Sequence, residues 1–300
     1  MMSDNVLACI MAFYPGNQFE NNCKAIAQKV SFLLIVDNSP ERTLHNSTVQ
    51  WPANTEIIYN KNEGAVAGAL NIALKVARER GFDYLQLFDQ DTEPPLHVTS
   101  QLISALKSNP HAVMVSPRFT NMNTGHPGRV MMDISKWKIK SVWPNTDVGI
   151  LNALFAINSA SVINMNLLPK DLFYDERLII DGCDVEFCLA LKTQNYTILV
   201  DTSQCIIHGI GNRKNGGGRW SPTNYSAQRK YLGAKNRMIV WRRYFKNYPG
   251  FILNDLYVFF LDTARTLLLE KQRFSKFAAI LKGLFEGCRE RDIAMRKYRQ

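Results

Sequence analysis

The sequence lacks the cysteine pairs and the long apolar runs that mark several classes of protein. Its six cysteines are scattered without a C-x-x-C pair, which argues against a disulfide framework or a structural zinc site and favours a reducing compartment. No basic start with a long apolar core opens the chain, so we expect no secretory signal and a cytoplasmic location. The charge-free span 148–169 contains six Asn and Ser side chains, which argues against a membrane span.

Acidic residues are absent between Asp201 and Asp255, where ten lysines and arginines occur. Residues 1–201 contain 16 Lys and Arg against 20 Asp and Glu, whereas residues 202–300 contain 20 against 6. The two parts therefore carry formal charges of −4 and +14. A field of this kind attracts phosphate groups, anionic lipid headgroups or nucleic acid.

Short apolar runs alternate with helical periodicity over the first 120 residues. Strands are expected at 6–12, 32–36, 56–59, 84–88 and 112–116, and helices from Asn17, over 66–77 and over about 95–106. This order predicts an α/β fold with a mainly parallel sheet and helices on both faces. Farther along the chain we expect a loop-rich excursion (117–147), a buried strand with a short helix (148–169), a helix (184–193) and a strand (197–200).

The stretch LFDQDT, residues 87–92, places two carboxylates at the end of an apolar strand. Asp89 and Asp91 together are suited to Mg²⁺ or Mn²⁺, which proteins bind through one or two carboxylates and the phosphate oxygens of a substrate. A bound cation would neutralise a diphosphate and make it a better leaving group. The alternative interpretation is an ordinary acidic turn.

Three further carboxylates, Asp181, Asp184 and Glu186, cluster at a strand-to-helix junction in IIDGCDVEF, residues 179–187. Carboxylates at a helix start are commonly caps. A desolvated one could instead act as general base on an acceptor hydroxyl.

His208 follows the strand-like run CIIH and could complete a ligand set with Asp89 and Asp91. A lone histidine is more often structural. Arg213, Lys214 and Arg219 flank a glycine-rich loop and are suited to holding phosphates, or to lying in solvent.

The motifs taken together resemble the inverting family 2 glycosyltransferases with the GT-A fold, in particular the bacterial rhamnosyltransferases that build surface polysaccharides. The resemblance runs from about residue 6 to residue 243. It rests on AFYP (12–15), IVDNS (35–39), NEGAVAGALNIAL (62–74), LFDQDT (87–92), IDGCDVEFCL (180–189), IIHGIG (206–211) and RKYLGAKN (229–236).

The resemblance implies a role for each matching position. Asp184 would be the catalytic base, with Asp181 and Glu186 orienting it or the acceptor. Asp89, Asp91 and His208 would hold Mn²⁺ or Mg²⁺. The donor nucleotide sugar would contact Tyr14, Pro15, Asp37, Asn62, Gly64, Asp89 and Gln90. Departures from the family pattern at Asn158–Ala160, Ala190 and Lys235–Asn236 lie on the acceptor side.

The expected enzyme moves L-rhamnose from dTDP-L-rhamnose to a lipid-linked acceptor of the O-antigen or capsule type, by one displacement that inverts the anomeric carbon. A galactofuranosyl- or hexosyltransferase that uses a UDP-sugar is the alternative. We expect a catalytic domain over 1–245 and a basic amphipathic helical region over 246–300. That region would contact the inner face of the membrane, another subunit of a homo-oligomer or the catalytic domain. A nucleic-acid-binding protein or an inactive scaffold would leave the acidic clusters unexplained.

Overall fold

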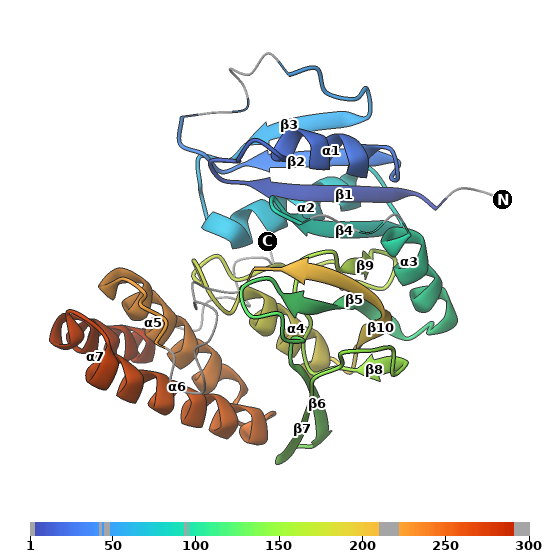
Figure 1. Ribbon diagram of the computed structural model, residues 1–300. Coiled ribbons are helices and arrows are strands. Elements are labelled where there is room, and N and C mark those ends of the chain that lie inside the picture. Colours follow the sequence, from blue (N-terminus) through green and yellow to red (C-terminus); the bar gives the residue numbers. More distant parts are fainter. Residues whose placement is uncertain are drawn as a thin grey trace.

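The computed structural model describes residues 4–41, 44, 49–92, 95, 97–209 and 222–290 of the 300-residue chain. Its strands are β1 (Val6–Ala12), β2 (Phe32–Asp37), β3 (Thr55–Tyr59), β4 (Tyr84–Asp89), β5 (Ala112–Asn121), β6 (Val130–Ser135), β7 (Lys138–Val142), β8 (Ile150–Asn152), β9 (Val162–Asn164) and β10 (Thr197–His208). Its helices are α1 (Phe19–Ala27), α2 (Ala65–Glu79), α3 (Val98–Ser108), α4 (Cys183–Thr193), α5 (Ala227–Tyr244), α6 (Pro249–Leu269) and α7 (Arg273–Arg289) (Figure 1).

The large sheet has the strand order β3-β2-β1-β4-β9-β5-β10-β8, and β6 and β7 form a separate hairpin. The pairs β3/β2, β2/β1, β1/β4 and β5/β10 are parallel, whereas β9 is antiparallel to both β4 and β5, and β8 to β10. Because β9 reverses direction on both sides, β5 and β10 run the same way as β1 to β4. The carboxyl ends of all these parallel strands therefore lie at one edge of the sheet, and the expected mainly parallel sheet is confirmed.

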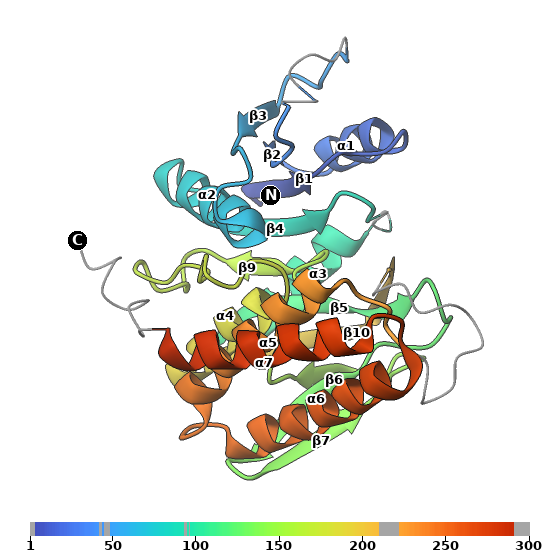
Figure 2. The same cartoon turned by 90° about the vertical axis from the view of Figure 1, so that its left-hand side faces the viewer.

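Both faces of the sheet are covered, which explains why its strands are continuous apolar runs. In the fully buried β1, Leu7 and Cys9 belong to the same apolar cluster as residues of α2, and Ala8 and Ile10 to the cluster that contains residues of α1. Figure 2 shows α1 and α2 on opposite sides of these strands. Alternate side chains of one strand thus join two separate cores.

Helices α5, α6 and α7 lie together beside the sheet, on the side of β10 and β5 rather than β3 (Figure 1). Helix α7 approaches α5 closely at two glycines. A Cβ on Gly283 would lie 2.3 Å from the carbonyl oxygen of Tyr231, and one on Gly287 would lie 2.6 Å from that of Lys235. Because α5 begins at Ala227, the helical group starts before residue 245; the domain boundary at that residue stays a prediction.

Three local expectations differ from the structure. Helix α1 begins at Phe19 with Gln18 as N-cap and no side-chain capping bond, so Asn17 does not open it. Residues 117–147 contain the end of β5 and the β6–β7 hairpin, and the described residues 148–169 contain β8 and β9 but no helix. The short strands β8 and β9 pair with strands far along the chain, which local periodicity does not reveal. Within the described residues no helix has the length and apolarity needed to cross a bilayer.

Candidate active site

Three polar side chains occupy the last position of a parallel strand. Asp37 ends β2, Asp89 ends β4 and His208 ends β10. Since these ends lie at one edge of the sheet, residues more than 100 positions apart in the chain meet there. Ligands of open α/β sheets bind at this edge.

Asp89, Asp91 and His208 form a cluster whose ligand atoms all lie within 4.8 Å of one another. His208 Nδ1 is 3.7 Å from Asp89 Oδ2, and this nitrogen is buried without a hydrogen-bond partner. Burial raises the pKa of Asp89 above its ordinary value; the His208 side chain works against that shift and the Asp91 carboxylate adds to it. An unpaired ring nitrogen beside two carboxylates is a donor set that fits Mn²⁺ or Mg²⁺.

The turn after β4 is fixed by contacts that cross the sheet edge. Thr92 donates its backbone N–H to the Asp89 carbonyl at 3.1 Å, and its hydroxyl lies 2.6 Å from that of Ser159. Gln90 accepts the backbone N–H of Phe13 through Oε1 at 2.7 Å. The Asp89–Asp91 turn is therefore tied to the loop after β1 and to the loop before β9.

Three of the residues expected to bind the nucleotide sugar lie at or just after the ends of β1 and β2: Tyr14, Pro15 and Asp37. Both carboxylate oxygens of the buried Asp37 accept backbone N–H groups, from Ser39 at 2.8 Å and Leu44 at 3.3 Å. Ser39 Oγ in turn accepts the N–H of Tyr14 at 2.9 Å. Tyr14 has a φ of 47°, and its side chain is half exposed and adjacent to Pro15. The structure thus assigns Asp37 an ordering role, and its contact with a nucleotide base stays a prediction.

The start of α2 lies at the same edge in a strained turn. Asn62, Gly64 and Ala65 all have positive φ values, of 57°, 64° and 50°, a conformation that non-glycine residues rarely adopt. A Cβ on Gly64 would lie 2.9 Å from the Glu176 side chain. Glu176 also accepts from Asn71 of α2 at 2.8 Å. The exposed Asn62 is therefore presented at the sheet edge by a turn that leaves no room for a side chain at residue 64.

Asp184 lies in the first turn of α4, which begins after Gly182 with a φ of 92°. Its Oδ1 accepts the backbone N–H of Val185 at 2.8 Å. Burial raises the pKa of Asp184 above its ordinary value, and the carboxylates of Asp181 and Asp89 add to the shift. Asp184 is thus in electrostatic range of the Asp89 cluster, and it is only partly shielded from solvent.

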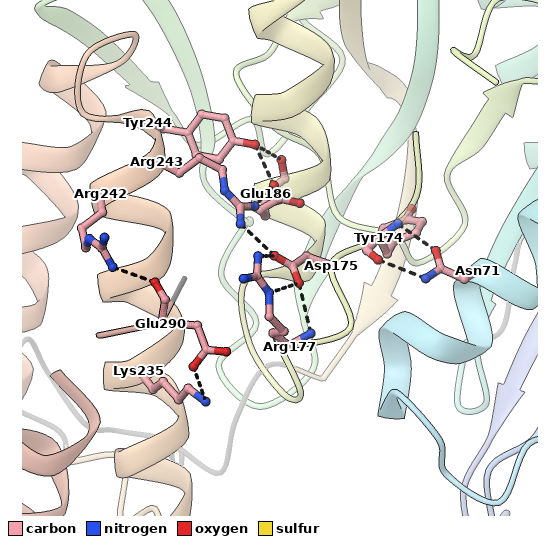
Figure 3. A network of polar contacts seen from close by, with 10 residues as sticks. All are labelled: Asn71, Tyr174, Asp175, Arg177, Glu186, Lys235, Arg242, Arg243, Tyr244 and Glu290. Atoms are coloured by element: carbon pink, nitrogen blue, oxygen red, sulfur yellow. Dashed lines mark hydrogen bonds and ion pairs between the residues drawn. The ribbon is translucent and has the colours of Figure 1, made fainter. Parts of the chain in front are cut away.

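Glu186 is buried and directed toward α5. Its carboxylate is paired with Arg243 and accepts the Tyr244 hydroxyl at 2.7 Å, and Arg243 also contacts Asp175 at 3.0 Å, as Figure 3 shows. Burial opposes ionisation of Asp175, yet the hydrogen bonds and charges of Arg177 and Arg243 lower its pKa below the ordinary value. This network joins α4 to α5, and a contact between Glu186 and an acceptor stays a prediction.

The remaining expected residues are the predicted acceptor and phosphate contacts. Asp181 is exposed just before α4 and is 3.2 Å from Arg229 of α5. Arg213, Lys214 and Arg219 lie outside the described residues. Sequence reasoning placed Ser39 and Ser159 within motif positions but assigned no contact to either, and it assigned no role to Arg243. Each acts through a contact 25 or more positions away in the chain, for which local spacing gives no signal.

Residues 20–166 match the model of the family described as Glycosyl transferase family 2. Over 275 residues the chain is 24% identical to the dTDP-rhamnosyl transferase RfbF of Shigella flexneri, covering 91% of this chain and 90% of that protein. The match therefore extends well beyond the family domain, through β10 and into the C-terminal helices.

Two solved structures show the same fold. GalNAc-T7 with UDP, GalNAc and Mn²⁺ superposes with a TM-score of 0.60 at 13% identity over 83% of this chain. TarS of S. aureus superposes with a TM-score of 0.59 at 12% identity over 97%. The chain spans about half the length of these two, 49% and 50%. At such identities the likeness establishes the GT-A fold alone.

Proposed function

Because the chain is a glycosyltransferase whose residues 20–166 form a family 2 domain, we propose that it is an inverting, metal-dependent rhamnosyltransferase. Its donor would be dTDP-L-rhamnose and its acceptor a lipid-linked surface polysaccharide of the O-antigen or capsule type. The donor assignment is supported by the relative named a dTDP-rhamnosyl transferase. The observation that carries the proposal is the meeting of Asp89, Asp91 and His208 at one sheet edge, in electrostatic range of Asp184.

Asp89, Asp91 and His208 would hold Mn²⁺ or Mg²⁺. Such an ion neutralises charge on a departing diphosphate. The chain's own contribution is to bring two carboxylates and an imidazole from separate strand ends within 4.8 Å. The turn that presents the two carboxylates is held by the hydrogen bonds of Gln90 and Thr92.

Asp184 would act as the general base. In the proposed step the acceptor hydroxyl oxygen bonds to the anomeric carbon, its proton passes to the Asp184 carboxylate, and the sugar–diphosphate bond breaks with its electron pair on the diphosphate. A single displacement of this kind inverts the anomeric carbon. The raised pKa of Asp184 makes it a stronger base than an exposed aspartate, closer to the working pH at which proton transfer is most efficient.

The donor nucleotide would lie over the ends of β1 and β2 and the start of α2. Tyr14, Pro15, Asn62 and Gly64 surround this edge, and Asp37 orders the loop after β2. The half-exposed Tyr14 ring could cover a flat base.

We further propose that the protein binds the inner face of the cell membrane. Large apolar side chains are exposed on α6 and α7, and basic side chains accompany them. An interfacial helix combines these two features, and each Lys or Arg near an anionic surface contributes about 1 kcal/mol. The apolar side chains are Leu253, Leu256, Tyr257, Phe260, Leu268, Leu269, Phe274, Leu281 and Phe285, and the exposed basic ones are Lys271, Arg273, Lys282 and Arg289.

Vesicle co-sedimentation tests the membrane proposal. Phe260→Ser and Phe274→Ser, whose side chains are exposed, should weaken binding to vesicles containing anionic lipid, and added salt should weaken it further. If the full chain ignores the vesicles but forms dimers that the same substitutions dissociate, this face is a subunit contact and the membrane proposal is wrong.

Donor turnover tests the enzymatic proposal. With Mn²⁺ or Mg²⁺ present, the protein should hydrolyse or transfer from dTDP-L-rhamnose, and dTDP-L-rhamnose with the ion should raise its thermal midpoint. Asp91→Asn should abolish the ion-dependent part of both signals, whereas Asp133→Asn, a carboxylate of β6 far from this edge, should retain them. Equal turnover by Asp91→Asn would refute the metal assignment, and preference for a UDP-sugar would identify a galactofuranosyl- or hexosyltransferase instead.

A further inference from the structure

A hollow lies between the start of α4 and the helices α5 and α6. It consists of two adjoining cavities of about 140 and 300 Å³, which share Asp181, Gly233 and Arg237 in their walls. Asp181 is three residues from Asp184 and contributes to the raised pKa of that carboxyl group. The α4–α5–α6 hollow therefore has in its wall a carboxylate that is close enough to the proposed base to affect its pKa.

The larger cavity is lined by four cationic side chains and by the carboxylates of Asp181 and Asp262, and one of the cations has no ion-pair partner. Lys230 lies 2.8 Å from Asp262, and Arg229 and Arg237 also have a carboxylate within 3.3 Å. Arg265, in the described part of the chain, has no carboxylate at ion-pair distance, and its Nε is buried without an acceptor. The cationic side chains that line the larger cavity are Arg229, Lys230, Arg237 and Arg265.

The smaller cavity offers an unused hydrogen-bond acceptor close to the base. Asn236 is 2% exposed and lines this cavity. Its amide nitrogen donates to the Asp181 carbonyl at 2.8 Å, but its Oδ1 has no donor. A buried polar atom without a partner is unfavourable unless a ligand or water satisfies it. The wall near the base is thus suited to a ligand hydroxyl.

Aromatic rings and a glycine shape the hollow. The Arg229 guanidinium lies 4.1 Å from the Tyr225 ring centre, and its Nε also lacks an acceptor. Gly233 lines both cavities, and a Cβ there would be in ordinary contact with Arg237 at 3.8 Å and Asp181 at 3.9 Å.

We propose that the α4–α5–α6 hollow is an acceptor subsite that reads a phosphate group. The acceptor hydroxyl would lie near Asn236 and Asp184, and the phosphate would contact the unpaired nitrogens of Arg229 and Arg265. Guanidinium groups suit this role because they bind phosphate oxygens in a fixed, often bidentate geometry. The assignment rests on the proposed transferase function, because it identifies the anionic end of the acceptor.

Titration calorimetry on the full chain in EDTA tests this subsite with two probes, geranyl diphosphate and inorganic pyrophosphate. EDTA removes divalent ions, so binding through the Asp89 cluster is suppressed. Wild-type protein should bind geranyl diphosphate, and Arg265→Gln should weaken that binding at least tenfold. Lys140→Gln removes one positive charge from an exposed position on β7 and should bind as the wild type does.

The two probes separate the sources of phosphate. Tighter binding of geranyl diphosphate supports a lipid diphosphate as occupant, and equal binding of pyrophosphate supports recognition of the phosphate group alone. If neither probe binds, or if Arg265→Gln and Lys140→Gln behave alike, the subsite is refuted. A matching thermal midpoint shows that Arg265→Gln is folded. Asp91→Asn should retain this binding, so failure of the metal-dependent reaction and failure of the subsite give different results.

Discussion

The sheet and the C-terminal helices maintain their structure by different means. Strand β1 is buried over all seven residues, and its stability comes from apolar side chains on both faces. In α6, a helix of 21 residues, five are buried, and the charged Lys230, Glu270 and Lys276 are buried where α5, α6 and α7 meet. The sheet can be predicted from the apolar pattern of its strands. The helices are joined by specific charge pairs, which no local sequence pattern predicts.

The joint between the two regions combines both means. Arg243 of α5 reaches Glu186 and Asp175 on the sheet side, and two residues before Glu186 is the proposed base Asp184. Positioning of the base and attachment of the helices therefore depend on the same first turns of α4. Substitutions at Asp184 and at the Glu186–Arg243 pair therefore distinguish an effect on catalysis from an effect on stability.

The largest expected effect is on catalysis, at Asp184. Asp184→Asn should lower the transfer rate by about 100- to 10,000-fold, the contribution of a general base. In the wild type the rate should fall as the pH drops through the raised pKa of this carboxyl, at a higher pH than an ordinary aspartate would give. Transfer kinetics from pH 4 to 9 measure both effects, and an unchanged rate in Asp184→Asn would place the base elsewhere.

The same substitution should change stability in the opposite direction. A carboxyl whose pKa is higher in the folded than in the unfolded chain makes the folded state less stable as the pH rises through that range. At neutral pH the neutral Asp184→Asn side chain should therefore raise the thermal midpoint in EDTA. A lower midpoint would show that the ionised Asp184 carboxylate stabilises the folded protein, which contradicts a raised pKa.

The next largest effect is on stability, at the Glu186–Arg243 pair. Glu186→Ala leaves the Arg243 charge without its closest partner and should lower the free energy of unfolding by about 3–5 kcal/mol, as is typical when one member of a buried pair is removed. Urea unfolding measures the change. The double variant Glu186→Leu with Arg243→Met replaces both charges by apolar side chains and should recover much of the loss; recovery of none would show that the pair does more than compensate buried charge.

More of the sheet edge than of the helix contacts can be predicted from the sequence. Asp37, Asp89 and His208 follow apolar runs, and parallel strands bring their carboxyl ends together, so the site edge could be predicted from strand order alone. The approach of Ser159 to Thr92 and of Arg243 to Glu186 joins residues 67 and 57 positions apart. These contacts depend on the three-dimensional path of the chain, as does the pairing of the three-residue β9 between β4 and β5.

Helix packing gives a smaller effect. Gly283→Ala places a methyl group 2.3 Å from the Tyr231 carbonyl oxygen, so α7 must move away from α5, and overpacking of this kind lowers stability by about 1–3 kcal/mol. The control is Gly16, which has no positive φ and has no atom within 4 Å of an added Cβ. Thermal unfolding of Gly283→Ala and Gly16→Ala should differ by several degrees.

The smallest effect is expected at an exposed ion pair on the surface of α2. Lys75 and Glu79 are 3.8 Å apart with side chains 69% and 61% exposed, and an exposed pair at this spacing contributes about 0.3–0.5 kcal/mol. Lys75→Gln should therefore leave the urea midpoint almost unchanged, and added salt should remove what difference there is. A loss comparable to that of Glu186→Ala would mean that charge pairs stabilise the sheet region as well, and the contrast between the two regions would not hold.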